Sequence, residues 1–223
     1  VFSRLPKPQA GRRFKDSDPV ARVASTILER VLEYEVEQNY DYRTTLANVV
    51  LDSLLGGRGT AWVRFDPEFG TSPQTTEDTE ELNEYIKSES APVDYVNWKD
   101  FGHSVARTWE EVTCVWRKVY MGKDALKKRF PDDYESIPME TFKTDDGEEI
   151  KNSEYGQAVI IELWDRLTKK AYWISKSVDH VLDERDDPLN LDSFFPCPKP
   201  LFSTLTSESL VPVPDFILYQ DQA

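Results

Sequence analysis

Two histidines, His103 and His180, and two cysteines, Cys114 and Cys197, are the side chains best suited to nucleophilic or general-base chemistry. Such a site needs a nucleophile, a base and an orienting group. The sequence has no G-x-S-x-G, H-E-x-x-H, phosphate-loop or G-x-G-x-x-G motif. Cys114 lies within an apolar run, which favours a buried, inert thiol in mid-strand. We therefore predict no catalytic residue, no cofactor and no enzymatic activity.

Carboxylates gather in two runs, residues 145–149 and 183–187. A calcium loop needs alternating oxygen ligands, a turn glycine and a final Glu at fixed offsets, and neither run fits. We interpret both runs as solvated acidic turns and predict no metal site. A carboxylate pair for glycoside hydrolysis stays open, because its spacing is spatial and the chain has 41 acids.

The six tryptophans raise the alternative of a carbohydrate-binding surface. Four of them, Trp62, Trp116, Trp164 and Trp173, fall in predicted strands, where Trp more often belongs to a core or an interface. Two short basic groups, 12–15 and 127–129, are interpreted as solvated faces rather than phosphate contacts.

These residues need elements to position them. Asp18 followed by Pro19 predicts a helix start. A second helix, 42–55, has an apolar face at Leu46, Val49, Val50 and Leu54, and the Gly56-Gly57 pair ends it and leads into a strand. Further patterns predict strands at 60–65, 92–96 and 112–120, a helix at 123–130, and a hairpin of 158–164 with 170–175. Segregated helices and strands indicate an α+β fold, with N-terminal helices packed on a mostly antiparallel sheet.

The net charge of −14 is unevenly distributed along the 223 residues. Residues 66–100 hold ten acids and two bases, and residues 132–154 hold nine acids and two bases. We expect 1–16 to be a flexible lead-in, 17–187 an α+β domain with acidic loops or insertions at 66–90 and 132–154, and 188–223 a Pro-rich connector crossing a surface into a helix.

Composition limits the classes of partner. The acidic balance argues against tight binding of nucleic acid or docking on an anionic membrane. Two distant cysteines make a disulfide framework improbable and favour a reducing compartment. The sequence begins at Val1 and ends as if a helix had just started, so we interpret it as a piece of a larger protein.

Several segments in succession resemble the wing region of tailed-bacteriophage portal proteins, the head-to-tail connectors, most closely those of podoviruses. No single segment is specific for this family, and the resemblance depends on the order of the segments over about residues 40–223. The segments are Leu54 to Val63, Val93 to Phe101, Ala106 to Val112, Met121 to Leu126 with Arg129-Phe130, Ile161 to Asp165 with Tyr172 to Ile174, and Leu210 to Phe216 with Tyr219 to Ala223.

The resemblance implies a homo-oligomeric ring of about twelve subunits with head-to-tail interfaces. Such a ring occupies one capsid vertex of the virion after synthesis in the host bacterial cytoplasm. Double-stranded DNA passes through it with weak contact during packaging and ejection. Terminase, capsid and tail or adaptor proteins dock on it, and the ATPase belongs to terminase. The alternatives from other classes are a carboxylate-dependent hydrolase acting on carbohydrate and a carbohydrate-binding module.

Overall fold

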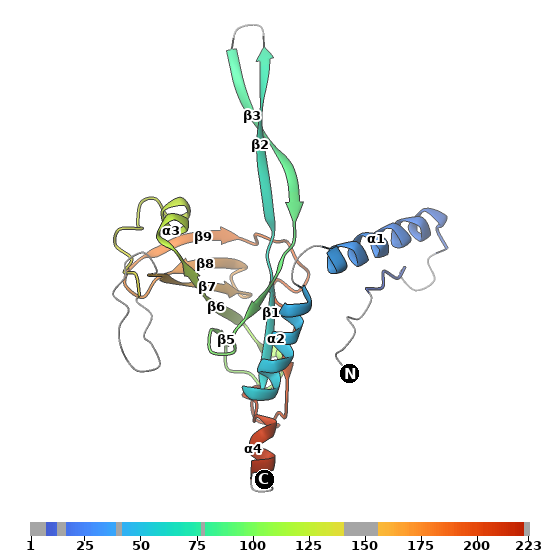
Figure 1. Ribbon diagram of the computed structural model, residues 1–223, viewed down its shortest axis with the longest axis vertical. Coiled ribbons are helices and arrows are strands. Elements are labelled where there is room, and N and C mark those ends of the chain that lie inside the picture. The colour runs from blue at the N-terminus through green and yellow to red at the C-terminus, as the bar shows by residue number, and fades with distance from the viewer. Residues whose placement is uncertain (1–7, 13–16, 39–41, 77–78, 141–155, 221–223) are drawn as a thin grey trace.

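The computed structural model describes residues 8–12, 17–38, 42–76, 79–140 and 156–220. Helices and antiparallel strands occupy separate stretches of the chain, which confirms the α+β class. Figure 1 shows two small sheets side by side, a long hairpin rising between them, and the first helix projecting to one side.

Two helices open the described chain. α1 (Pro19–Gln38) begins as predicted, because the Val20 backbone N–H donates to Asp18 Oδ1 at 2.9 Å. α2 (Tyr42–Leu55) is followed by the glycine pair, and the φ of Gly57, 79°, lies in the left-handed region that glycine adopts readily. The predicted cap and strand entry at this glycine pair are confirmed.

The three-stranded sheet has the order β10 (Leu201–Phe202), β1 (Arg58–Val63) and β4 (Val93–Val96). α2 packs on β1 and β4. The contact requires a glycine, because a Cβ on Gly59 would lie 1.9 Å from the Val49 carbonyl oxygen.

The five-stranded antiparallel sheet confirms the predicted hairpin and adds two strands that the sequence pattern did not indicate, β5 and β9. Its order is β5 (Phe101–His103), β6 (Cys114–Met121), β7 (Ala158–Asp165), β8 (Lys170–Ile174) and β9 (Val181–Asp186). A 3-10 turn (Trp109–Glu111) precedes β6, and α3 (Lys123–Arg129) follows it as predicted.

The acidic stretch 66–90 differs from the expected loop. It forms a long antiparallel ribbon, β2 (Asp66–Thr76) paired with β3 (Thr79–Ser90), which rises away from both sheets (Figure 1). Its polar, Thr-rich sequence lacks apolar alternation, because a ribbon that projects from the core does not need one buried face. In the second acidic stretch, residues 141–154 lie outside the described residues.

The described residues form two hydrophobic clusters. The larger lies between the sheets and includes Trp62, Val115, Trp164 and Phe194. The smaller packs α3 against β7 through Leu126, Phe130 and Ile160, among others. Burying these large side chains supplies most of the favourable free energy of folding.

Part of the Pro-rich segment 188–223 is buried, although the sequence led us to expect a connector that crosses a surface. Phe194 and Phe195 are buried in the larger cluster, and Val63 N–H donates to the Pro196 carbonyl at 2.8 Å. The prolines keep this segment extended, and its aromatic side chains then fill the space between the sheets. The described chain ends with the short helix α4 (Asp215–Tyr219).

The expectation that both N-terminal helices pack on the sheet holds for α2 alone. No described residue of α1 is buried, and α1 extends away from the sheets in Figure 1. Among the helices that the structure describes, none combines the length and hydropathy needed to cross a bilayer.

Candidate functional site

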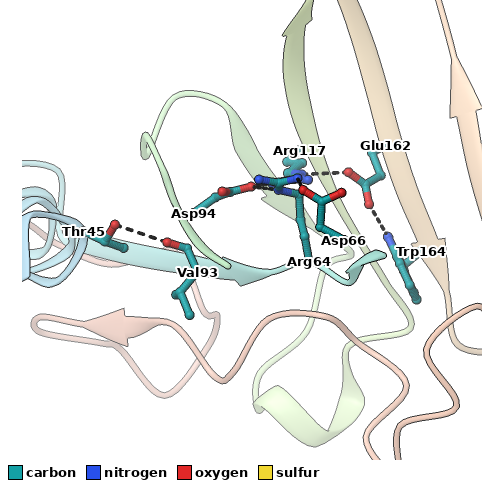
Figure 2. Close-up of polar contacts among 8 residues, drawn as sticks. All are labelled: Thr45, Arg64, Asp66, Val93, Asp94, Arg117, Glu162 and Trp164. Carbon is teal, nitrogen blue, oxygen red and sulfur yellow. Dashed lines mark hydrogen bonds and ion pairs between the residues drawn. The ribbon is translucent and has the colours of Figure 1, made fainter. Parts of the chain in front are cut away.

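A row of charged side chains joins the two sheets below the hairpin, as Figure 2 shows. Arg64 Nε lies 2.5 Å from Asp94 Oδ2, and Arg117 donates to the same oxygen over 3.1 Å. Arg117 Nε donates to Glu162 Oε2 over 2.8 Å, and Trp164 Nε1 donates to Glu162 Oε1 over 2.9 Å. We call Arg64, Asp94, Arg117 and Glu162 the inter-sheet cluster.

Strand alternation places the side chains of Arg117 and Glu162 on the buried faces of their strands. On β7, Glu162 shares the buried face with Ile160 and Trp164. On β6, Arg117 shares the buried face with Val115 and stands directly opposite Glu162 in the ladder. Side chains two residues apart point the same way, so the apolar neighbours force both charges inward.

Burial makes this pairing obligatory. The side chains of Arg117 and Glu162 are each 8% exposed, and the Arg117 guanidinium also lies 4.7 Å from the centroid of the Trp62 ring. A buried charge without a partner is costly, whereas a paired and hydrogen-bonded one is tolerated. Arg117 also contacts Asp94 and Trp62 of the three-stranded sheet, so the buried pair links the two sheets.

The same cluster holds the base of the hairpin. Arg64 follows β1 directly and lies two residues before β2, and its guanidinium lies 3.7 Å from Asp66, the first residue of β2. Arg64 N–H donates to the Pro92 carbonyl at 2.9 Å, and Ser90 Oγ donates to the Asp66 carbonyl at 3.2 Å. These ion pairs and hydrogen bonds attach the base of the ribbon to the core and so set the direction in which the ribbon projects.

An open cleft of about 1010 Å³ lies over the cluster. The hairpin base, β4 and residues of β6, β7, β8 and β9 line it, with Phe65, Tyr95, Trp173 and Arg185 among its side chains. The two carboxylates of the cluster that face it are already engaged, since both Glu162 oxygens accept hydrogen bonds and one Asp94 oxygen accepts from two arginines. This arrangement suits positioning rather than proton transfer.

The two thiols are poor nucleophiles. Cys114 is the first residue of β6 and only partly buried, which differs from the mid-strand, buried position expected from the sequence. Burial, followed by the nearby Asp165 charge, raises its pKa. Burial also raises the pKa of Cys197 to about 12. Both thiols are therefore protonated at neutral pH, which favours inert side chains.

The histidines serve local structure. The Nδ1 atom of His103 lies 2.8 Å from the Ser104 carbonyl, and burial is the main cause that lowers the pKa of His103. His180 Nε2 lies 2.9 Å from Asp133 Oδ1, on the surface. Among the described residues no group of three or more His, Cys, Asp or Glu side chains is arranged to hold a metal ion.

The acidic run 183–187 is not a solvated turn, because most of it belongs to the edge strand β9. Asp183 pairs with Arg129 and, at 3.1 Å, with Arg185, so the run is held by cations on its own sheet and on α3. The basic group 127–129 is accordingly more than a solvated face, since Arg129 also stacks 5.1 Å from the Trp173 ring. The other acidic run, 145–149, and most of the basic group 12–15 lie outside the described residues.

Of the four strand tryptophans, Trp62 and Trp164 are buried in the core. Trp116 and Trp173 are partly exposed. The predicted core role is confirmed for the first two.

Sequence reasoning missed the inter-sheet cluster. The signal was present in the alternation of β6 and β7, where an Arg and a Glu occupy positions that the pattern reserves for apolar side chains. Their pairing needs the strand register, which the pattern does not give.

No protein-family model matches this chain, and no curated protein matches its sequence.

Proposed function

We propose that this chain is a structural subunit of the portal ring at one capsid vertex of a tailed bacteriophage. In this role it forms part of the conduit for DNA packaging and ejection and of the docking site for terminase, capsid and tail proteins. The proposal rests on the order in which the portal-like segments follow one another over about residues 40–223. It places the protein in the virion.

One structural observation carries the proposal. The ribbon β2–β3 and the helix α1 both project from the two-sheet body, and none of the α1 residues whose burial is described is buried. A two-stranded ribbon or a single helix is only marginally stable in water without a packing surface. Such projections are typical of a subunit whose remaining contacts come from an assembly.

Electron microscopy and mass photometry of the intact protein test the proposal. We expect closed rings of about twelve copies, since head-to-tail contacts that close generate rings. A strict monomer at tens of micromolar would contradict it. Because the net charge is −14, we also expect no submicromolar binding of duplex DNA at physiological salt, as measured by fluorescence anisotropy.

The carbohydrate alternatives are favoured by the cleft with Trp173 on its wall. A hydrolase needs one carboxylic acid that donates a proton, and the engaged oxygens of Glu162 do not offer one. A binding module needs a stacking ring that Trp173 is able to provide. Isothermal titration with oligosaccharides separates these functions from the portal: millimolar or tighter binding abolished by Trp173→Ala would favour the module.

A further inference from the structure

α1 carries an apolar stripe that the described part of the chain leaves uncovered. The six side chains of the stripe are each at least half exposed, and they are Val20, Val23, Ile27, Leu28, Val31 and Tyr34. The helical spacing puts them on one broad face, wider than the narrow seam of a two-helix coiled coil. The stripe therefore suits a broad surface rather than a single partner helix.

α2 buries two polar residues, Asp52 and Ser53, beside Val49, and leaves Leu51, Leu54 and Leu55 exposed. Asp52 is buried, and its Oδ2 accepts from the Tyr95 hydroxyl at 2.7 Å and from Trp98 N–H at 2.9 Å. Leu54, expected on the packed face, is 53% exposed. These buried hydrogen bonds set the rotation of the helix, because a buried carboxylate without them would be costly.

The outward leucines continue onto α4, which lies against α2. Together they form what we call the α2–α4 patch. Its side chains are about half exposed, and they are Leu51, Leu54, Leu55, Phe216, Ile217 and Leu218.

The stripe and the patch match in size. From the exposed fractions of the six side chains, each offers about 600 Å² of apolar surface, as large as the largest patch on a typical monomer. Joined, they would bury about 1200 Å², the lower limit of a stable, specific interface.

We propose that the α1 stripe of one copy docks on the α2–α4 patch of a second copy. The argument is that this chain supplies both halves of an apolar interface of sufficient area and that the structure does not pack them together. Two different patches meet in this contact, so each docked copy leaves one stripe and one patch free. Repetition of the contact therefore joins copies head to tail. That the series of copies closes into a ring rests on the proposed function.

Mixing of two variants of the intact protein tests the contact. The stripe variant is Ile27→Glu with Val31→Glu, and the patch variant is Leu51→Glu with Leu55→Glu. All four side chains are at least half exposed, so folding is expected to persist, with circular dichroism as the check. Ser25→Glu with Thr26→Glu, off the stripe on α1, adds the same charge and serves as the control.

Each variant alone is expected to be monomeric by sedimentation, with a dissociation constant for self-association raised about 100-fold or more. The control variant assembles like the wild type. An equimolar mixture of stripe and patch variants is expected to form a 1:1 pair and stop there, because one intact stripe meets one intact patch. A mixture that stays monomeric would overturn the proposal, as would stripe variants that assemble normally.

The two proposals fail differently. Normal rings formed by the stripe variant would overturn the docking contact and leave the portal function standing. Open filaments of the wild type, with pairs restored on mixing, would uphold the contact and contradict the portal function. If the α1 stripe binds a different protein instead, the wild type stays monomeric and the mixture of stripe and patch variants forms no pairs. That result would overturn the proposed contact.

Discussion

Replacing Glu162 by Gln removes one charge from the inter-sheet cluster while keeping the shape of the side chain. Arg117 then remains 8% exposed, and Asp94, at 3.1 Å, is the carboxylate partner left to it among the described residues. Removing one member of a buried pair costs about 3–5 kcal/mol, and the remaining Asp94 contact offsets part of it. We expect Glu162→Gln to lower the free energy of unfolding by about 3 kcal/mol.

Guanidinium denaturation followed by tryptophan fluorescence measures this change. With a slope of about 5 kcal/mol per molar for a chain of this size, the midpoint is expected to fall by about 0.6 M. Glu184→Gln is the matched control, because Glu184 pairs with Lys170 at the surface, where both side chains are more than a third exposed. Its loss is expected to stay below about 1 kcal/mol.

A double variant separates the two contributions to this cost. If the uncompensated Arg117 charge causes most of the loss, Arg117→Met with Glu162→Leu is expected to be more stable than Glu162→Gln alone, because no buried charge is left on either strand. A Glu162→Gln protein within about 0.5 kcal/mol of the wild type would refute the assigned role of the pair. A double variant less stable than the single one would refute the assigned cause.

Three further predictions follow from the described contacts. Gly59→Ala is expected to cost more than about 2 kcal/mol in thermal unfolding, because its Cβ would overlap the helix backbone, whereas Gly122→Ala meets no atom within 4 Å and serves as the control. Because burial lowers the pKa of His103 below 6.5, the unfolded chain takes up a proton that the folded chain resists. The wild-type protein therefore loses stability as the pH falls below about 6.5, and His103→Gln is expected to lose stability less steeply over that range. Iodoacetamide at pH 8 is expected to label Cys114 slowly and Cys197 only on unfolding, as mass spectrometry would show.

Each of these has a result that would count against it. Equal melting temperatures for the two glycine variants would mean that the helix and strand shift apart at little cost. Parallel stability profiles for wild type and His103→Gln would show that this imidazole does not resist protonation. Rapid native labelling of Cys197 would mean that local opening exposes the thiol.

The sequence by itself determined the local elements whose signals are local. The start of α1 follows from Asp18 and Pro19, the end of α2 from the glycine pair, and the β7–β8 hairpin from its two apolar strands and the short polar loop between them. Caps, turns and periodicity act over a few residues, so they can be predicted from a short stretch of chain. The α+β class followed from their order.

Only the tertiary structure decided which side of each element is buried and which charges meet. Asp52 faces inward on α2 because Tyr95 and Trp98 supply its donors from β4 and the turn that follows it. Arg117 and Glu162 meet across a register that no local pattern encodes. Partners distant in sequence set the cost of burying a polar group, so the inter-sheet cluster and the outward leucines of α2 appear only once the sheets have come together.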